Sequence, residues 1–208
     1  MRQMRVLIAC EHSAIMRDAF IGQGFYAMSC DLRPTDSKLG PHYQGDVRDV
    51  LHWEWNLMVA HPTCTYLCNS GVRWLHTQPG RSELMVEGAE FFNTLRNAPI
   101  KHKAIENPIP HKYAVERIGK YSQIVQPWQF GHGETKATCF WLENLPLLVP
   151  TNIVVGREHR IHRLPPGPNR SKIRSITYPG IARAGAVQWG AYIKSVACQT
   201  SANTQRAT

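Results

Sequence analysis

Two short segments carry the side chains that are best placed to do chemistry. Cys64 lies on a turn stiffened by Pro62, shortly after the apolar run 56–60. Glu106 directly follows another apolar run, 102–105. A cysteine that follows a buried strand is presented at the edge of a sheet, where its thiolate can act as a nucleophile. The pattern therefore favours an active site built on a cysteine nucleophile, with a carboxyl group brought to the same edge.

Each of these residues also has an ordinary structural interpretation. A single cysteine most often fills space as a small apolar side chain, and a single glutamate is most often solvated. Asp31, which follows the apolar run 26–30, can serve as a helix cap or a turn residue. The repetition of the pattern favours a shared site, because Asp31 and Asp46 also lie at the ends or edges of the first predicted strand and helix units.

The elements that position these residues follow from the hydrophobic periodicity. We expect strands at 6–9, 26–30, 56–60, 102–105, 122–127 and 138–142, and helices at 13–22, 81–97 and 181–197. In the second helix the side expected to face inward comprises Leu84, Gly88, Phe91, Phe92 and Leu95. Alternation of strands and helices predicts an α/β fold with a mostly parallel sheet and helices on both faces. Ligands bind such sheets at the carboxyl ends of the strands, where the polar residues above are found.

Length and composition restrict the class of protein. The chain has 208 residues, of which 43% are hydrophobic and 19% charged, so one folded domain with an appendage is expected and a disordered chain is excluded. No apolar run is long enough to span a bilayer, and the first residues do not resemble a secretory signal. The 6 cysteines and the histidines lack metal-ligand spacing, which predicts no metal site and no disulfide framework. These features are typical of a cytoplasmic protein without a membrane partner.

The charge of +9 is unevenly distributed along the chain. Residues 143–175 contain 5 prolines and little apolar periodicity, which predicts a basic, loop-rich insertion. Its basic residues are Arg157, Arg160, Arg163, Arg170, Lys172 and Arg174. A solubilising surface would explain net charge alone. Residues 143–208 carry +7 and residues 1–142 only +2, and this segregation favours a nucleic acid as partner.

In this order, the segments resemble the DNA cytosine-5 methyltransferase family. Pro62-Thr63-Cys64 resembles the family's nucleophile loop, with Thr63 where proline is usual, and Glu106-Asn107-Pro108 matches its Glu-Asn-Pro triplet without change. Residues 130–140 resemble a later motif in which Glu134, Lys136 and Thr138 replace a glutamine and two arginines. Residues 177–182 look like the start of the last motif, and 10–14 replace the glycine-rich cofactor turn without a glycine. The resemblance covers most of 5–142 and 176–197 and is greatest to compact, mostly phage-encoded members.

The resemblance implies a Rossmann-like S-adenosylmethionine-dependent methyltransferase fold. Residues 1–142 and 176–200 would form the catalytic and cofactor-binding domain, 143–175 a short target-recognition insertion, and 201–208 a flexible tail. Cys64 would attack carbon 6 of a flipped-out cytosine, and Glu106 would share a proton with ring nitrogen 3. The partner would be DNA, most simply double-stranded, in the cytoplasm of a bacterial host if the protein is phage-encoded.

The resemblance also implies the remaining site residues. S-adenosylmethionine would be bound by Asp31 at the ribose and Asp46 near the adenine, with Glu11 taking part. The residues implied to contact nucleic acid are Lys136, Arg157, Arg160, Arg163, Arg170, Lys172 and Arg174.

Two alternatives stay open at this point. The same fold could modify another pyrimidine substrate, such as RNA or a nucleotide, because no large recognition domain is present. The chain could also be a nucleic-acid-binding relative without catalysis, which the altered cofactor turn and the replacements at Lys136 and Thr138 favour. Retention of both Cys64 and Glu106 weighs against that second alternative, because binding alone requires neither.

Overall fold

A computed structural model describes residues 3–206 of the chain, with side chains described as far as residue 199. In this part of the chain seven strands form one sheet, in the order β3-β2-β1-β4-β5-β7-β6. The strands are β1 (Arg5–Ala9), β2 (Tyr26–Asp31), β3 (His42–Gln44), β4 (Leu57–Ala60), β5 (His102–Pro108), β6 (Gln123–Val125) and β7 (Thr138–Glu143). Strands β1 to β5 pair in parallel, and β7 runs antiparallel to both β5 and β6. The predicted α/β, Rossmann-like fold with a mostly parallel sheet is confirmed.

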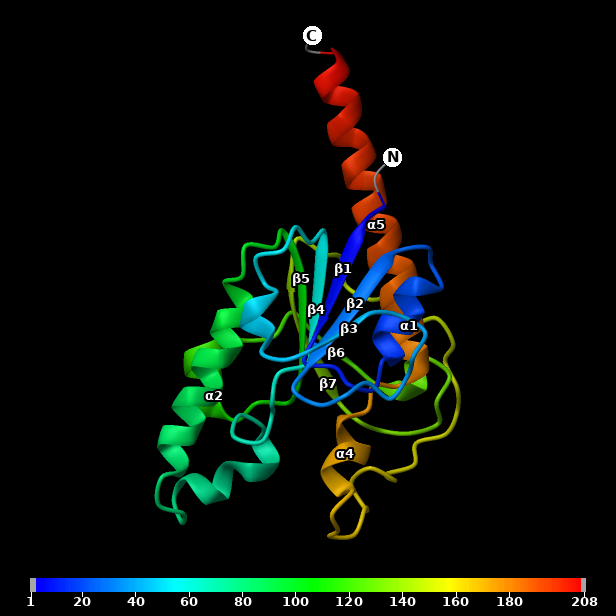
Figure 1. The fold of residues 1–208 in the computed structure, drawn as a ribbon. Helices are drawn as coiled ribbons and strands as arrows, with labels where there is room; N and C mark the ends of the chain where they lie inside the picture. The colour runs from blue at the N-terminus through cyan, green and yellow to red at the C-terminus, as the bar shows by residue number, and fades with distance from the viewer. Residues whose placement is uncertain (1–2, 207–208) are drawn as a thin grey trace.

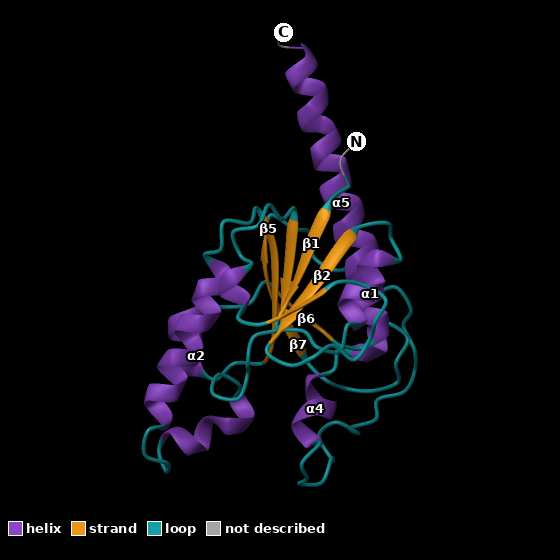
Figure 2. Ribbon diagram, viewed as in Figure 1, coloured by secondary structure: helices purple, strands orange, loops and turns teal. Residues whose placement is uncertain are grey.

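Helices cover both faces of this sheet (Figures 1 and 2). On one face lie α1 (Ile15–Ile21) and α5 (Pro179–Arg206), which pack against each other. On the other face lie α2 (Arg81–Arg96) and α3 (Lys112–Ile118). The remaining helical segments are the short helix α4 (Arg170–Ser175) and three 3-10 turns, η1 (Val47–Asp49), η2 (Asn69–Leu75) and η3 (Pro127–Gln129).

The central strands are buried on both faces, which explains why they read as continuous apolar runs. In β1, Val6 and Ile8 pack into the cluster under α1 and α5. Leu7 and Ala9 pack into the opposite cluster under α2. Successive side chains of a strand point to opposite faces, so each strand contributes to both clusters. The result is a sheet buried on both faces, with the polar residues of interest at the carboxyl ends of its parallel strands.

The structure refines several expectations about the elements. The short strand β3 was not predicted from the sequence, and β5 continues through Pro108 because its residues 103–108 pair with β7. The inner face of α2 is shifted by one residue at its start: Met85 is buried, whereas Leu84 is 37% exposed and the prediction that it faces inward is wrong. Leu84 lies in the first turn of the helix, where the amphipathic pattern is least constrained.

The C-terminal helix is longer than the sequence predicts. Helix α5 continues to Arg206, and Figure 1 shows its last turns extending past the edge of the sheet. It therefore includes most of the segment 201–208 that was expected to be a flexible tail, while residues 207–208 lie outside the described part. Helix α5 begins close to η3, because a Cβ at Gly180 would overlap the carbonyl oxygen of Phe130. Neither α5 nor any other helix within residues 3–206 combines the length and apolar character needed to cross a membrane.

Candidate active site

A cavity of about 340 Å³ opens at the carboxyl edge of the sheet. The strand order reverses between β1 and β4, and a crevice forms at this type of switch point. The lining residues that matter for the chemistry are Glu11, Asp31, His61, Cys64, Glu106, Lys136 and Arg174. Lys136 reaches the same edge because it lies two residues before β7, whose first residue, Thr138, pairs with Pro108 at the end of the antiparallel strand β5. The topology thus brings six of the sequence-predicted site residues into one pocket.

The start of the loop that carries Cys64 is held by two hydrogen bonds, one from the backbone and one from a side chain. The backbone N–H of His61 donates to the carbonyl of Ala9 (2.9 Å), and the Nδ2 of Asn107 donates to the carbonyl of Pro62 (3.1 Å). Asn107 is 1% exposed, so the Glu-Asn-Pro segment supports the cysteine loop from the neighbouring strand. The side chain of Cys64 is half-buried and lines the cavity.

Cys64 is coupled to a second thiol one turn later, Cys68. The backbone N–H of Cys68 donates to the carbonyl of Cys64 (3.0 Å), and its Sγ lies 3.1 Å from the Oγ of Ser70. The hydrogen bond from Cys64, together with those from Ser70 and Gly71, lowers the pKa of Cys68 to about 5. The same hydrogen bond and burial raise the pKa of Cys64. The contact between the two thiols thus shifts their pKa values in opposite directions.

Glu106 lines the cavity together with a histidine, His61, and a lysine, Lys136. The Nδ1 of His61 is 3.2 Å from its Oε2, and the two side chains are 9% and 13% exposed. Burial acts to raise the pKa of Glu106, but the hydrogen bond and charge of His61, with the charge of Lys136, outweigh it and lower the pKa. Lys136 donates from Nζ to the carbonyl of Ile176 (3.0 Å), and burial lowers its pKa against the opposing effect of Glu106.

The turn after β1 has the backbone geometry of a glycine-rich turn without a glycine. Cys10 and Ala14 have φ values of 59° and 64°, in the left-handed region that favours glycine. Between them, Glu11 is 4% exposed and accepts hydrogen bonds from the backbone N–H groups of Met16 (2.8 Å) and Arg17 (3.2 Å). Glu11 therefore caps the first turn of α1, where a carboxylate compensates the unpaired N–H groups.

The two aspartates expected to bind the cofactor have different locations. Asp31 ends β2 and lines the cavity, where its Oδ1 accepts from the backbone N–H of Arg33 (2.9 Å). Asp46 follows β3 and is not among the residues that line the cavity. Its carboxylate pairs with Arg48 (2.8 Å), and the hydrogen bonds from Arg48 lower its pKa.

The predicted basic residues are only partly gathered at the cavity. Arg174 on α4 lines the cavity with Lys136, while Arg163 is exposed outside it. The other four contact the protein itself. Arg157 stacks on Trp128 with its guanidinium carbon 3.8 Å from the ring centre, and Arg160 pairs with Glu134 (3.0 Å). Arg170 donates to the carbonyl of Leu164 (2.9 Å), and Lys172 pairs with Asp36 (3.1 Å).

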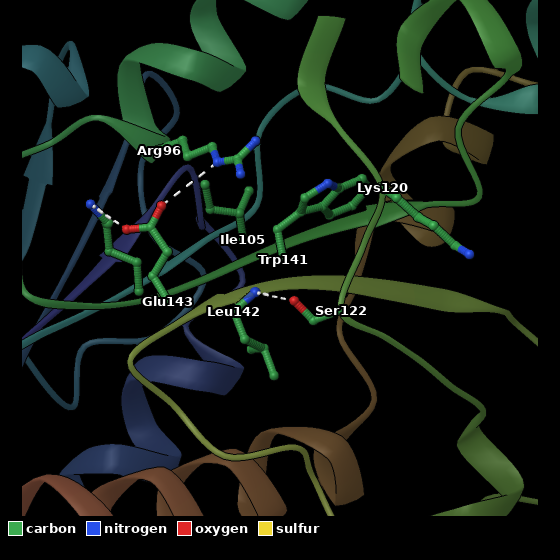
Figure 3. Close-up of a pocket in the computed structure, with 8 residues that line it drawn as sticks. Arg96, Ile105, Lys120, Ser122, Trp141, Leu142 and Glu143 are labelled. Atoms are coloured by element: carbon green, nitrogen blue, oxygen red, sulfur yellow. Dashed lines mark hydrogen bonds and ion pairs between the residues drawn. The ribbon is translucent and has the colours of Figure 1, made fainter. Parts of the chain in front are cut away.

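A second, much smaller cavity lies at the opposite edge of the sheet (Figure 3). It has a volume of about 40 Å³ and contains Glu143, which pairs with Lys103 (2.9 Å) and Arg96 (3.6 Å). Lys103 is at the start of β5 and Glu143 at the end of β7, so this cavity faces away from the carboxyl ends of the parallel strands. The compensated charges indicate a structural ion-pair cluster.

One residue that lines the large cavity, His61, was not singled out from the sequence. Its position directly before Pro62 could have suggested that it shares the edge with Cys64, but its contact with Glu106 joins residues 45 positions apart. Among residues 3–206 no group of three or more histidine, cysteine, aspartate or glutamate side chains is arranged to hold a metal ion.

Comparison with known proteins gives limited results. No protein-family model and no curated protein sequence matches the chain. One similar solved structure is described as a DNA modification methyltransferase encoded within a prophage (E. coli). It matches with a TM-score of 0.48 and 12% sequence identity, over 73% of this chain and 52% of the other. The chain thus spans about half the length of that protein.

Proposed function

We propose that the protein is an S-adenosylmethionine-dependent DNA cytosine-5 methyltransferase. The observation that carries this proposal is the convergence of Cys64, Glu106 and Lys136 in one cavity at the carboxyl edge of the sheet. These residues come from three separate segments, which follow β4, end β5 and precede β7. A thiol, a carboxyl group and an ammonium group are the set that attack on a pyrimidine ring requires.

Each of the three groups has a defined role in the proposed reaction. The Cys64 thiolate forms a bond to carbon 6 of cytosine, and the electron pair of the ring's double bond moves toward carbon 5. Glu106 delivers a proton to ring nitrogen 3, which neutralises the charge that arrives on the ring. Carbon 5 is then nucleophilic enough to be methylated. Carbon 5 then gives its proton to solvent water, the double bond re-forms as the thiolate of Cys64 leaves, and ring nitrogen 3 returns its proton to Glu106.

Cys64 must lose its proton before it attacks. Its hydrogen bond to Cys68 and its burial both oppose that loss, because they raise the pKa of Cys64. The ammonium group of Lys136 interacts electrostatically with Cys64 and favours the Cys64 thiolate. Lys136 is therefore the group that we assign to activation of the nucleophile.

The chain's own residues fit a methyl donor of the S-adenosylmethionine type. Asp31 presents a carboxylate to the cavity at the end of β2, suited to the hydroxyl groups of a ribose. The left-handed Cys10 and Ala14 give the turn after β1 the tight path that lets a ligand approach the backbone. Glu11 acts indirectly in this proposal, by capping α1 and fixing the turn. When bound, the donor supplies an electrophilic methyl group.

The basic residues around the cavity favour a polyanionic substrate. Lys136 and Arg174 line the cavity, and Arg163 is exposed. Those cations would contact phosphates, which gives affinity that depends on salt and carries little sequence information. The other basic residues of the segment would have to exchange their present protein partners for a phosphate. We therefore assign a weaker contribution to DNA binding to Arg157, Arg160, Arg170 and Lys172. The proposal retains segment 143–175 as the recognition element.

The decisive experiment is transfer of a labelled methyl group from S-adenosylmethionine to a panel of substrates. The panel contains double-stranded DNA, single-stranded DNA, RNA and free nucleotides. We expect label at carbon 5 of cytosine in double-stranded DNA, and loss of transfer in C64A. Label in RNA or nucleotides alone would refute DNA as the substrate. No transfer to any member, combined with DNA binding by the wild type, would show a binding protein without catalysis.

A further inference from the structure

His61 is a buried polar residue of the cavity to which the reaction above gives no role. Its side chain is 9% exposed and lies beside Glu106. Its second ring nitrogen, Nε2, is buried and has no hydrogen-bond partner within residues 3–206. An unpaired buried nitrogen costs free energy, so its presence at a site calls for a function.

We propose that His61 is a positioning residue that holds Glu106 and supplies the proton which Glu106 passes to the target ring. The proposal rests on the proposed function, because it assigns the source of a proton in that same reaction. The imidazolium form of histidine is accessible near neutral pH, which makes histidine the usual side chain for this task.

The backbone and the ion pair together fix the geometry of His61. Its backbone N–H is bound to the carbonyl of Ala9 (2.9 Å), and the following residue, Pro62, is buried and accepts a hydrogen bond from Asn107 (3.1 Å). The imidazole Nδ1 is therefore held 3.2 Å from the Oε2 of Glu106. This contact engages one carboxyl oxygen and leaves the other, Oε1, for the substrate.

The surroundings of Glu106 explain why it needs a proton source. The charged and titratable groups that act on it are His61 after β4, Lys136 before β7 and, as thiols, Cys64 after β4 and Cys139 in β7. The hydrogen bond and electrostatic effect of His61, with the charge of Lys136, hold the pKa of Glu106 below its ordinary value despite burial. At neutral pH the carboxylate is therefore ionised and carries no proton of its own to give.

The proposed proton movement is balanced. As the bond between Cys64 and carbon 6 forms, the proton on Nδ1 of the His61 imidazolium moves to Glu106, and Glu106 gives a proton to ring nitrogen 3. Neutral imidazole and an ionised carboxylate remain. When the thiolate leaves at the end of the reaction, ring nitrogen 3 returns the proton by the same path. No oxidant, reductant or further reactant is needed.

The first test measures the ionisation of Glu106 without any substrate. The protein is labelled with carbon-13 at glutamate side-chain carboxyl groups, and E106Q assigns the resonance. In the wild type Glu106 should titrate below ordinary glutamate. In H61L its pKa should rise above the wild-type value, because burial remains while the hydrogen bond is lost. In H61N, where an amide N–H can replace Nδ1, the rise should be smaller; an unchanged pKa in both variants would overturn the proposal.

The second test is the pH profile of methyl transfer. Wild-type kcat should fall as pH rises through the titration of the histidine and glutamate pair. H61N should lower kcat at neutral pH by about 100-fold, at the low end for a lost acid and base group, and move the alkaline limb to lower pH. The control is H102N, because His102 is a buried histidine at the other end of β5, where it contacts the carbonyl of Asn144 (2.7 Å). The alkaline limb of the kcat profile should lie at the same pH in H102N as in the wild type.

The outcomes separate the two proposals. An H61N profile with an unmoved alkaline limb refutes the role of His61 while leaving the methyltransferase intact. Absence of transfer by the wild type at every pH refutes the proposed function, and the Glu106 titration still decides whether His61 controls its charge. Restoration of the limb in H61N by added imidazole would support a proton role, since a purely structural side chain cannot be replaced by a soluble base.

Discussion

The strongest stability prediction concerns Arg17, a fully buried arginine on α1. Its side chain is 0% exposed and makes contacts that join α1 to the segment between β2 and β3. Nε donates to Asp18 (2.9 Å) and Nη2 to the carbonyl of Ser37 (2.9 Å). Nη1 contacts Ser29, Thr35 and the carbonyl of Pro41 at 3.1, 3.3 and 3.4 Å. We expect R17M to keep the apolar stem but remove all five hydrogen bonds.

The expected loss of unfolding free energy depends on which hydrogen bonds the partners of Arg17 keep in R17M. Removing one member of a buried ion pair costs about 3–5 kcal/mol when the other charge is left uncompensated. Here the Oδ2 of Asp18 still accepts from Ser37 (2.7 Å), and its side chain is 26% exposed. The carbonyl of Pro41 still accepts from the backbone of Ser29 (3.2 Å). The loss of unfolding free energy should therefore be near the lower end, about 3 kcal/mol.

Urea unfolding measures this loss directly. With a slope of about 2 kcal/mol per molar urea, 3 kcal/mol corresponds to a midpoint lowered by about 1.5 M. The matched control is R48M, because Arg48 also pairs with an aspartate (2.8 Å) but is 64% exposed, so its loss should be under about 1 kcal/mol. Hydrogen exchange at residues 35–41 should rise in R17M alone. Equal midpoints for the two variants would refute the argument that burial makes Arg17 important.

Three further predictions concern the site. With DNA that contains 5-fluorocytosine, the wild type should form a covalent adduct that resists denaturation and is seen by electrophoresis. C64A should abolish this adduct, whereas the control C68A should retain it. An adduct in C64A would show that another residue is the nucleophile. A14G replaces a fully buried alanine in the left-handed region, and it should change the free energy of unfolding in urea by less than about 1 kcal/mol, because relief of backbone strain offsets the lost methyl group. The control A182G, at an equally buried position in α5, should lower the free energy of unfolding by about 2 kcal/mol. Equal losses in the two variants would show that Ala14 is not strained. Because the pKa of Glu106 is lowered in the folded state, its contribution to stability is present above the ordinary glutamate pKa and is lost as pH falls through the lowered pKa. The midpoint of urea unfolding should therefore depend less on acid pH in E106Q than in the wild type. Equal pH dependence of the two midpoints would contradict a lowered pKa.

Local sequence patterns predicted the sheet and the location of the principal site residues well. Buried parallel strands read as continuous apolar runs, so β1 and β4 were identified within one position, and β5 at its start, although it continues three residues beyond the predicted run. Strand β3 was missed because it has three residues, of which none is fully buried. A segment this short and this exposed shows no hydrophobic periodicity from which a strand could be predicted.

The residues that sequence patterns did not predict are those fixed by contacts between distant segments. Arg17 lies in a helix whose amphipathic pattern gives no sign that a guanidinium is fully buried, because its partners come from residues 29–41. Asp46 was expected at the cofactor, yet Arg48 only two positions later satisfies its carboxylate outside the cavity. Both differences arise from the path of the chain between β2 and β3, which local propensity does not determine.

The chemistry of the site also depends on a topological feature, the reversed strand β7. A parallel strand at that position would begin at the opposite edge of the sheet, and the residue two positions before it would lie far from Glu106. Because β7 runs antiparallel, with Thr138 beside Pro108, Lys136 enters the cavity and its charge reaches both Glu106 and Cys64. In the proposed reaction the same charge that favours the Cys64 thiolate adds to the hydrogen bond and charge of His61 in lowering the pKa of Glu106. An ionised Glu106 needs a proton source for the proposed transfer to the ring. His61, whose Nδ1 lies 3.2 Å from the Oε2 of Glu106, is the side chain placed to supply it.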